Sequence, residues 1–130
     1  MMERTLPPVT PFTQPWFDGC ARGELLLQHC LETYNIDSSR VCMTGLSMGG
    51  FGTWRLAMAY PDRFAAIAPV CGGGDPDQAP EVAHLPTWVF HGAKDDVVSI
   101  ENSKRMANAL KKAGGNVKFT IIFSTMKDPG

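Results

Sequence analysis

Hydrophobic residues recur along the chain in two patterns, and the alternation of these patterns predicts the fold. Four short apolar runs, bounded by polar or glycine residues, are typical of buried strands. These runs occupy residues 40–45, 64–71, 86–91 and 117–123. Apolar residues spaced three and four apart predict helices over 48–60 and 100–113, and a further helix is expected over 18–34. The order predicts an α/β fold in which about four parallel strands are connected by crossover helices.

Composition divides the chain into three parts. Residues 1–17 are rich in proline and are expected to be irregular, residues 18–123 to form the α/β domain, and residues 124–130 to form a tail. Within the domain, residues 72–85 are rich in Gly, Asp, Pro and Ala and predict a loop. Ser99 and Gly114 are placed to begin and end the helix predicted over 100–113.

Charge and hydropathy argue against nucleic-acid binding and against a membrane span. The chain carries 12 basic and 13 acidic residues, with a formal net charge of -1, and neither sign forms a stripe or a run. We therefore expect no nucleic-acid partner. Because no apolar stretch approaches the length of a transmembrane helix, no membrane span is expected. The N-terminus lacks the apolar core of a secretory signal, so a cytoplasmic location is predicted.

The cysteines give no sign of a metal centre. The chain contains 4 of them, at positions 20, 30, 42 and 71, without a Cys-x-x-Cys spacing or a cluster with histidine. No metal or organic cofactor is therefore expected. Cys42 and Cys71 fall in apolar runs and are expected to pack as small hydrophobic side chains, and whether any two cysteines pair is left open.

The segment Gly45-Leu46-Ser47-Met48-Gly49 has the pattern of a nucleophilic serine on a sharp turn. It lies between a predicted strand and a predicted helix, so Ser47 is expected at the apex of the turn in a strained backbone conformation. The backbone N–H of Met48 would then be a donor to an oxyanion, at the positive end of the helix dipole. The glycines following Ser47 predict a close approach between helix and sheet. The competing interpretation is a glycine-rich turn whose serine has no chemical role.

A second polar segment follows the predicted strand 86–91. It reads His91-Gly92-Ala93-Lys94-Asp95-Asp96, and it would lie at the same sheet edge as Ser47, because the carboxyl ends of parallel strands meet there. One carboxylate of the pair Asp95 and Asp96 is expected to orient a histidine and to stabilise its charged form. The alternative is a solvated acidic loop.

These motifs, together with Trp54 and the segment 61–64 (Pro-Asp-Arg-Phe), resemble those of the α/β-hydrolase superfamily. They are most similar to its branch of small carboxylesterases, phospholipase/carboxylesterases and dienelactone-hydrolase-like proteins. The resemblance implies a partial α/β-hydrolase fold and a serine carboxylesterase acting on a small-molecule ester. It implies that Ser47 is the nucleophile, that Asp95 rather than Asp96 is the acid, and that no cofactor is needed.

The histidine of the implied triad has no counterpart in this chain. The family carries it just after the strand that corresponds to 117–123, and residues 124–130 contain none. His91 is predicted to be packed or bonded to backbone, His29 to lie on the surface, and His84 to lie in a loop from which Ser47 is reachable in principle. We therefore expect the histidine to come from outside these residues. The alternative is a truncated, inactive hydrolase-like chain that self-associates through exposed sheet edges.

Overall fold

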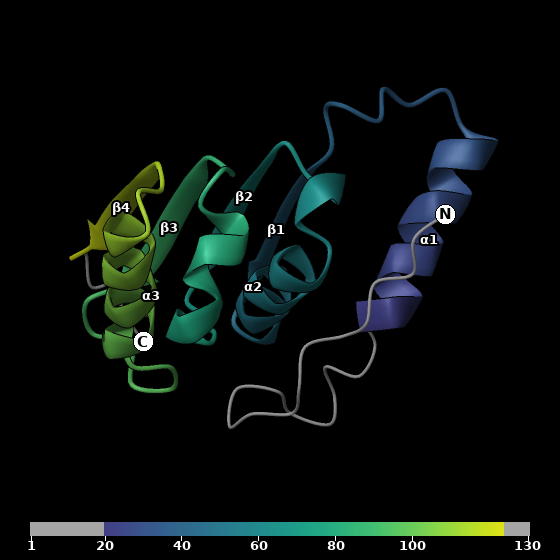
Figure 1. Cartoon of the computed structure of the whole chain (residues 1–130). Coiled ribbons are helices and arrows are strands. Elements are labelled where there is room, and N and C mark those ends of the chain that lie inside the picture. The colour runs from purple at the N-terminus through teal and green to yellow at the C-terminus, as the bar shows by residue number, and fades with distance from the viewer. Residues whose placement is uncertain (1–19, 124–130) are drawn as a thin grey trace, which may run out of the picture.

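Helices and strands alternate along the chain as the sequence predicts (Figure 1). The computed structural model describes residues 20–123, so the predictions for 1–17 and 124–130 lie outside the described residues. In chain order the α-helices and strands are helix α1 (Cys20–Thr33), strand β1 (Cys42–Leu46), helix α2 (Met48–Ala59), strand β2 (Ala66–Val70), strand β3 (Thr87–Gly92), helix α3 (Ile100–Lys112) and strand β4 (Val117–Ile122).

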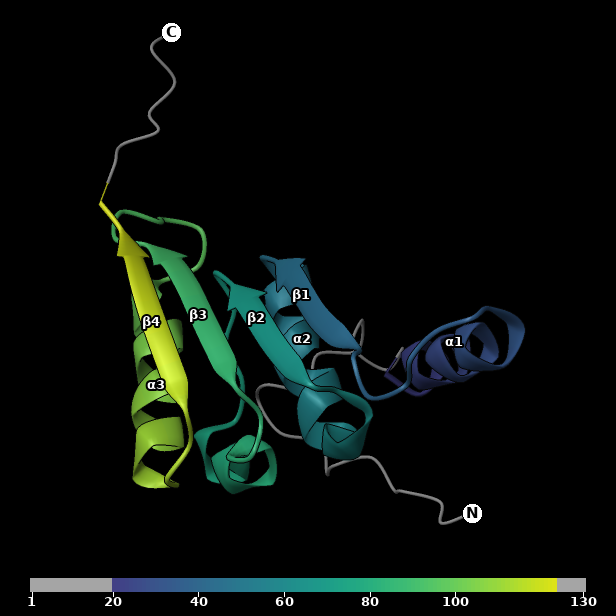
Figure 2. The same ribbon diagram turned by 90° about the horizontal axis from the view of Figure 1, so that it is seen from above.

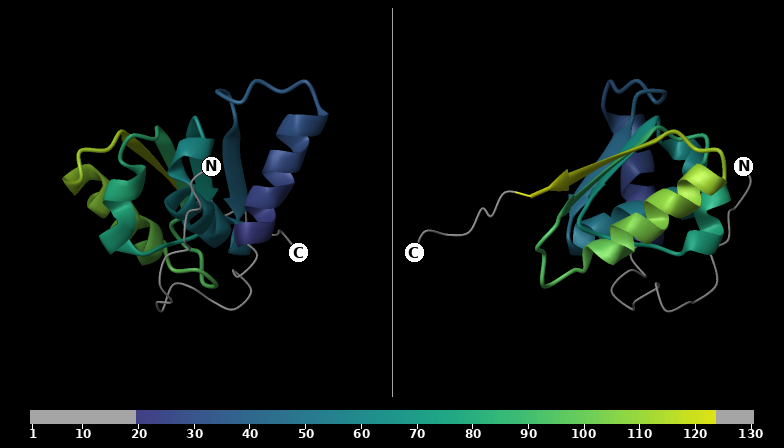
Figure 3. Two further views of the ribbon diagram at one scale, coloured as in Figure 1. Left: turned by 45° about the vertical axis from the view of Figure 1, so that its right-hand side comes forward. Right: turned by 90° about the vertical axis from the view of Figure 1, so that its left-hand side faces the viewer.

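The four strands form one parallel sheet in the order β1-β2-β3-β4. Leu46 pairs with Val70, Val70 with Phe90 and His91 with Ile121, so the carboxyl ends of the strands meet at one edge. Helices α2 and α3 cover one face, and α1 lies beyond the edge strand β1, where it packs against α2 (Figures 2 and 3). The predicted α/β architecture is confirmed.

The hydrophobic core lies between the sheet and the helices on that one face. Trp54 and Met58 of α2 and Met106 and Leu110 of α3 pack around Val89 of β3, and all five are buried. The four helical residues lie at the spacings on which the sequence prediction rests. Burial of these apolar side chains is the main force that holds the two helices against the strands, and thereby fixes where their ends lie.

The prediction of an irregular loop over 72–85 is wrong in part. Residues Pro76–Val82 form a 3-10 helix, η3, on the same face of the sheet as α2 and α3. Asp75 caps this helix by accepting a hydrogen bond from the N–H of Asp77. Ala79 and Val82 are buried at a spacing of three residues, which matches the period of a 3-10 helix, and Leu85 is buried just after it. Composition alone does not reveal this short period.

The boundaries of α3 agree with the sequence signals. The hydroxyl oxygen of Ser99 accepts a hydrogen bond from the N–H of Glu101 at 3.2 Å, as an N-cap does. Gly114 has a φ of 82° and follows the last turn, where glycine adopts the left-handed conformation without strain. The N–H of Gly115 donates to the carbonyl of Leu110 at 2.8 Å, which closes the helix.

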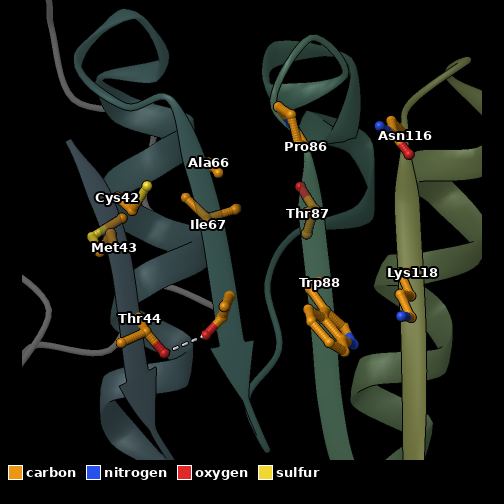
Figure 4. A pocket seen from close by; sticks show the side chains of 11 residues that line it. Cys42, Met43, Thr44, Ala66, Ile67, Pro86, Thr87, Trp88, Asn116 and Lys118 are labelled. Carbon is orange, nitrogen blue, oxygen red and sulfur yellow. Dashed lines mark hydrogen bonds between the residues drawn. The ribbon is translucent and has the colours of Figure 1, made fainter. Parts of the chain in front are cut away.

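The opposite face of the sheet carries no helix within the described residues, and a shallow groove of about 480 Å³ crosses it (Figure 4). Trp88 lies in the groove, where its ring nitrogen donates to Thr120 and the ammonium of Lys118 lies 4.1 Å from the ring centroid. Cys42 is exposed on β1 beside the groove, so the prediction that it packs as a buried hydrophobic residue is wrong. Within residues 20–123, no helix is long and apolar enough to cross a membrane.

We predict that Gly50→Ala lowers the free energy of unfolding by about 3 kcal/mol, because the added Cβ would overlap the carbonyl oxygen of Val70 in the neighbouring strand. Gly49→Ala is the matched control, since a Cβ at Gly49 meets no atom within 4 Å. In this control the free energy of unfolding should be unchanged or higher by up to about 1 kcal/mol, from helix propensity. Urea denaturation measures both, and equal effects of the two substitutions would contradict the close approach.

Candidate active site

Ser47 forms the apex of the turn between β1 and α2. Its φ of 57° and ψ of -110° are strained for a residue with a side chain, as the motif predicts. The N–H of Ser47 donates to the carbonyl of Val70 at 2.9 Å, and its own carbonyl accepts from Phe51 at 3.1 Å. The side chain makes no capping hydrogen bond to the helix. The N–H and the carbonyl of Ser47 are therefore both fixed by backbone hydrogen bonds, whereas its hydroxyl does not cap the helix.

Glycines make this turn sterically feasible. A Cβ at Gly45 would overlap the backbone of Gly49, and a Cβ at Gly72 would overlap the backbone of Gly50. The first turn of α2 therefore packs directly against the end of β1 and against the chain that leaves β2. The predicted close approach of helix and sheet is present at Gly50.

Met48 is the first residue of α2, and its side chain is exposed. N–H groups in the first turn of a helix have no carbonyl within the helix to bind, and the helix dipole gives them a positive partial charge. The N–H of Met48 therefore belongs to a backbone segment suited to stabilise a negative charge that develops next to Ser47.

Asp95 lies in the loop after β3 and is held by backbone hydrogen bonds. Its Oδ1 accepts from the N–H groups of Val97 and Val98, at 2.9 Å each, and its own N–H donates to the carbonyl of Gly92 at 3.2 Å. Asp96, the other predicted candidate, is exposed. Of the two carboxylates, Asp95 is thus the one with a fixed orientation at the edge where the strands end.

Cys71 lies beside Ser47 where β2 ends, a position that the sequence prediction missed. It follows β2 with a φ of 42°, and it is half-buried rather than packed in the core. Burial raises the pKa of the Cys71 thiol, a hydrogen bond from the Ser47 backbone opposes that rise, and the charge of Asp95 adds to it. The thiol is therefore close enough to both residues for each to affect its pKa. Cys71 is the next residue after Val70, which pairs with Leu46, and this register places it beside Ser47.

None of the three histidines is placed as a base for Ser47. His91 is fully buried and its ring contacts Ser103 and the carbonyl of Val98, which confirms the prediction that it is packed and bonded to backbone. His84 lies near the carbonyl of Pro61, before the start of β3 and thus at the opposite end of the strands from Ser47. His29 is exposed on α1, 3.5 Å from the hydroxyl of Thr33.

A parallel sheet flanked by helices, with a strained serine between a strand and a helix, is the arrangement of the α/β hydrolases. Comparison with known sequences identifies the family within this class. The sequence profile of the dienelactone hydrolase family matches residues 20–125, and the chain belongs to that family.

Several similar proteins are named as esterases or depolymerases. A poly(3-hydroxyalkanoate) depolymerase C from Paucimonas lemoignei is 55% identical over 48 residues, which are 37% of this chain and 12% of that protein. A bifunctional acetylxylan esterase/xylanase from Neocallimastix patriciarum is 32% identical over 80 residues, covering 58% of this chain and 11% of that protein. The crystal structure of a thermostable esterase superposes with a TM-score of 0.79 and 41% identity, over 81% of this chain and 28% of that one. The chain thus spans a small part of each.

We predict that Ser47→Gly raises the free energy of unfolding by about 1 kcal/mol relative to Ser47→Ala, because glycine adopts a positive φ without strain whereas alanine keeps the Cβ. Both variants lack the hydroxyl, so their difference isolates the backbone strain. Chemical denaturation provides the comparison. A Ser47→Ala variant as stable as Ser47→Gly would show that the turn is not strained.

We predict that iodoacetamide alkylates Cys71 more slowly than Cys42 at pH 8. The raised pKa of the Cys71 thiol leaves less thiolate at a given pH, and the rate should continue to rise above the pH at which an ordinary thiol reaches its plateau. Peptide mass spectrometry over a pH series measures both residues in one sample, with exposed Cys42 as the internal reference. A Cys71 profile that reaches its plateau at lower pH than that of Cys42 would contradict the assigned environment.

Proposed function

We propose that this chain carries the serine centre of a hydrolase acting on carboxylic esters, with Ser47 as the nucleophile. The observation that carries the proposal is the strained backbone of Ser47 at the carboxyl end of β1 and the start of α2. Membership of the dienelactone hydrolase family supports it. The similar proteins named as depolymerase and esterase support an ester as the substrate class.

In the proposed reaction the hydroxyl oxygen of Ser47 attacks the carbonyl carbon of the ester, while the hydroxyl proton passes to a base. The N–H of Met48 donates to the oxyanion that forms, and the alcohol then leaves with the proton from the base. Water hydrolyses the acyl-serine in a second round of the same steps. The carboxylate of Asp95 orients the base and stabilises its charged form.

The base in this scheme is a histidine, and it is none of the three in this chain, His29, His84 and His91. We propose that it comes from sequence outside these 130 residues. A serine hydroxyl without a neighbouring base is a weak nucleophile at neutral pH. In the chain by itself, Ser47 is therefore expected to react slowly with electrophiles. Only the turn geometry and the oxyanion donor would then assist the reaction.

The positions of the histidines also favour a second candidate, a hydrolase-like chain without activity. In that case the two edge strands of the sheet, β1 and β4, provide surfaces for association with further copies, because the outer backbone groups of an edge strand can pair with another strand. This candidate retains the fold and the turn but assigns Ser47 no chemical role.

A fluorophosphonate probe distinguishes the two candidates. We predict that the probe modifies the 130-residue chain on the peptide containing Ser47, and that Ser47→Ala abolishes the modification. Intact-mass and peptide mass spectrometry over several hours give its extent and site. Asp96→Asn, which changes an exposed carboxylate next to Asp95, is the control and should label as the parent does. Absence of labelling in the parent as well as in Ser47→Ala would favour the inactive candidate.

A further inference from the structure

The buried imidazole of His91 joins the two loops at the proposed site. The side chain is fully buried, and both ring nitrogens have partners. Nδ1 lies 2.6 Å from the hydroxyl oxygen of Ser103 in α3, and Nε2 lies 2.7 Å from the carbonyl oxygen of Val98 in the loop after β3. The hydroxyl of Ser103 also lies 3.4 Å from the carbonyl of Gly72, in the turn after β2. The imidazole thus lies between the segments that follow two adjacent strands.

The partners of the ring define its protonation. A carbonyl oxygen only accepts hydrogen bonds, so the short contact with Val98 places a proton on Nε2. The hydroxyl of Ser103 lies 2.6 Å from Nδ1 and donates to the carbonyl of Gly72 at 3.4 Å. These contacts require a proton on Nε2. Asp95 Oδ2, at 3.6 Å from Nε2, is too far away to be the acceptor of that proton.

The residue that His91 holds is also one that orients Asp95. Val98 receives the hydrogen bond of His91 at its carbonyl oxygen, and its N–H donates to Oδ1 of Asp95. The loop is closed at its other end by the N–H of Asp95, which donates to Gly92 next to His91 in the chain. The His91 side chain therefore holds the Val98 end of the loop, and the backbone of Gly92 holds the end at Asp95.

We propose that His91 is a positioning residue for Asp95, acting through Val98. This proposal rests on the proposed function, which gives the fixed carboxylate of Asp95 its role. The geometry around His91 is testable without any reaction. Loss of the hydrogen bond from Nε2 should free the carbonyl of Val98 and loosen the turn that Asp95 forms with Val97 and Val98. Amides elsewhere in the sheet should be unaffected.

Hydrogen exchange by NMR on the full 130-residue chain tests the proposal. In His91→Phe we expect the amides of Val97 and Val98 to exchange about tenfold faster, the effect of one lost buried hydrogen bond. The amides of Ser47 and Ala65, which donate to Val70 and Val41 away from this loop, are the references and should change less than about twofold. His91→Gln, which retains a side-chain N–H donor, should restore part of the protection. Equal acceleration at all four amides, or none at Val97 and Val98, would overturn the proposal.

A second measurement does not depend on the folding of the variants. The ¹⁵N signals of the His91 ring in the unaltered chain should show a proton on Nε2, and protonation at Nδ1 alone would overturn the proposal. Neither measurement involves the reactivity of Ser47. Failure of fluorophosphonate labelling would therefore count against the proposed function only, and unchanged exchange at Val97 and Val98 against the positioning role only.

Discussion

The direct backbone contact between the start of α2 and the chain leaving β2 is the constraint on which the rest of the site depends. The N–H of Ser47 donates to Val70, and Gly50 and Gly72 are so close that neither position has room for a side chain. This contact forces the chain to turn within one residue, and the strain of that turn falls on Ser47. Burial of Trp54 and Met58 in the core holds α2 in place against that strain.

The register of the sheet determines where the other residues of the site lie relative to this contact. Leu46 pairs with Val70, so Ser47 and Cys71 are the next residues on adjacent strands. Val70 pairs with Phe90, and the N–H of Cys71 continues the ladder by donating to Phe90. The loop that carries Asp95 begins two residues further along β3. The groove on the helix-free face, lined by Trp88 and Lys118, lies toward the starts of the strands and takes no part in this arrangement.

The sequence predicted the features that depend on local pattern. Helical and strand periods located the elements, and the glycines around Ser47 predicted the strained turn that the structure contains. The 3-10 helix η3 was missed because its period of three is hidden among proline and glycine. The place of Cys71 was missed because it depends on the pairing of β1 with β2, which no local pattern specifies. The roles assigned to Ser47, Met48 and Asp95 remain predictions.

We propose that the backbone orients Ser47 to react and that residues 20–123 supply no base for it, and imidazole added in solution tests this proposal directly. Free imidazole can take the proton that a histidine of the protein would take. The measurement is the rate at which a fluorophosphonate modifies Ser47, with and without imidazole, in the parent chain and in Ser47→Ala. We predict an imidazole-dependent increase in the parent and no modification of the variant at that peptide. A rate in the parent that does not respond to imidazole would contradict the account.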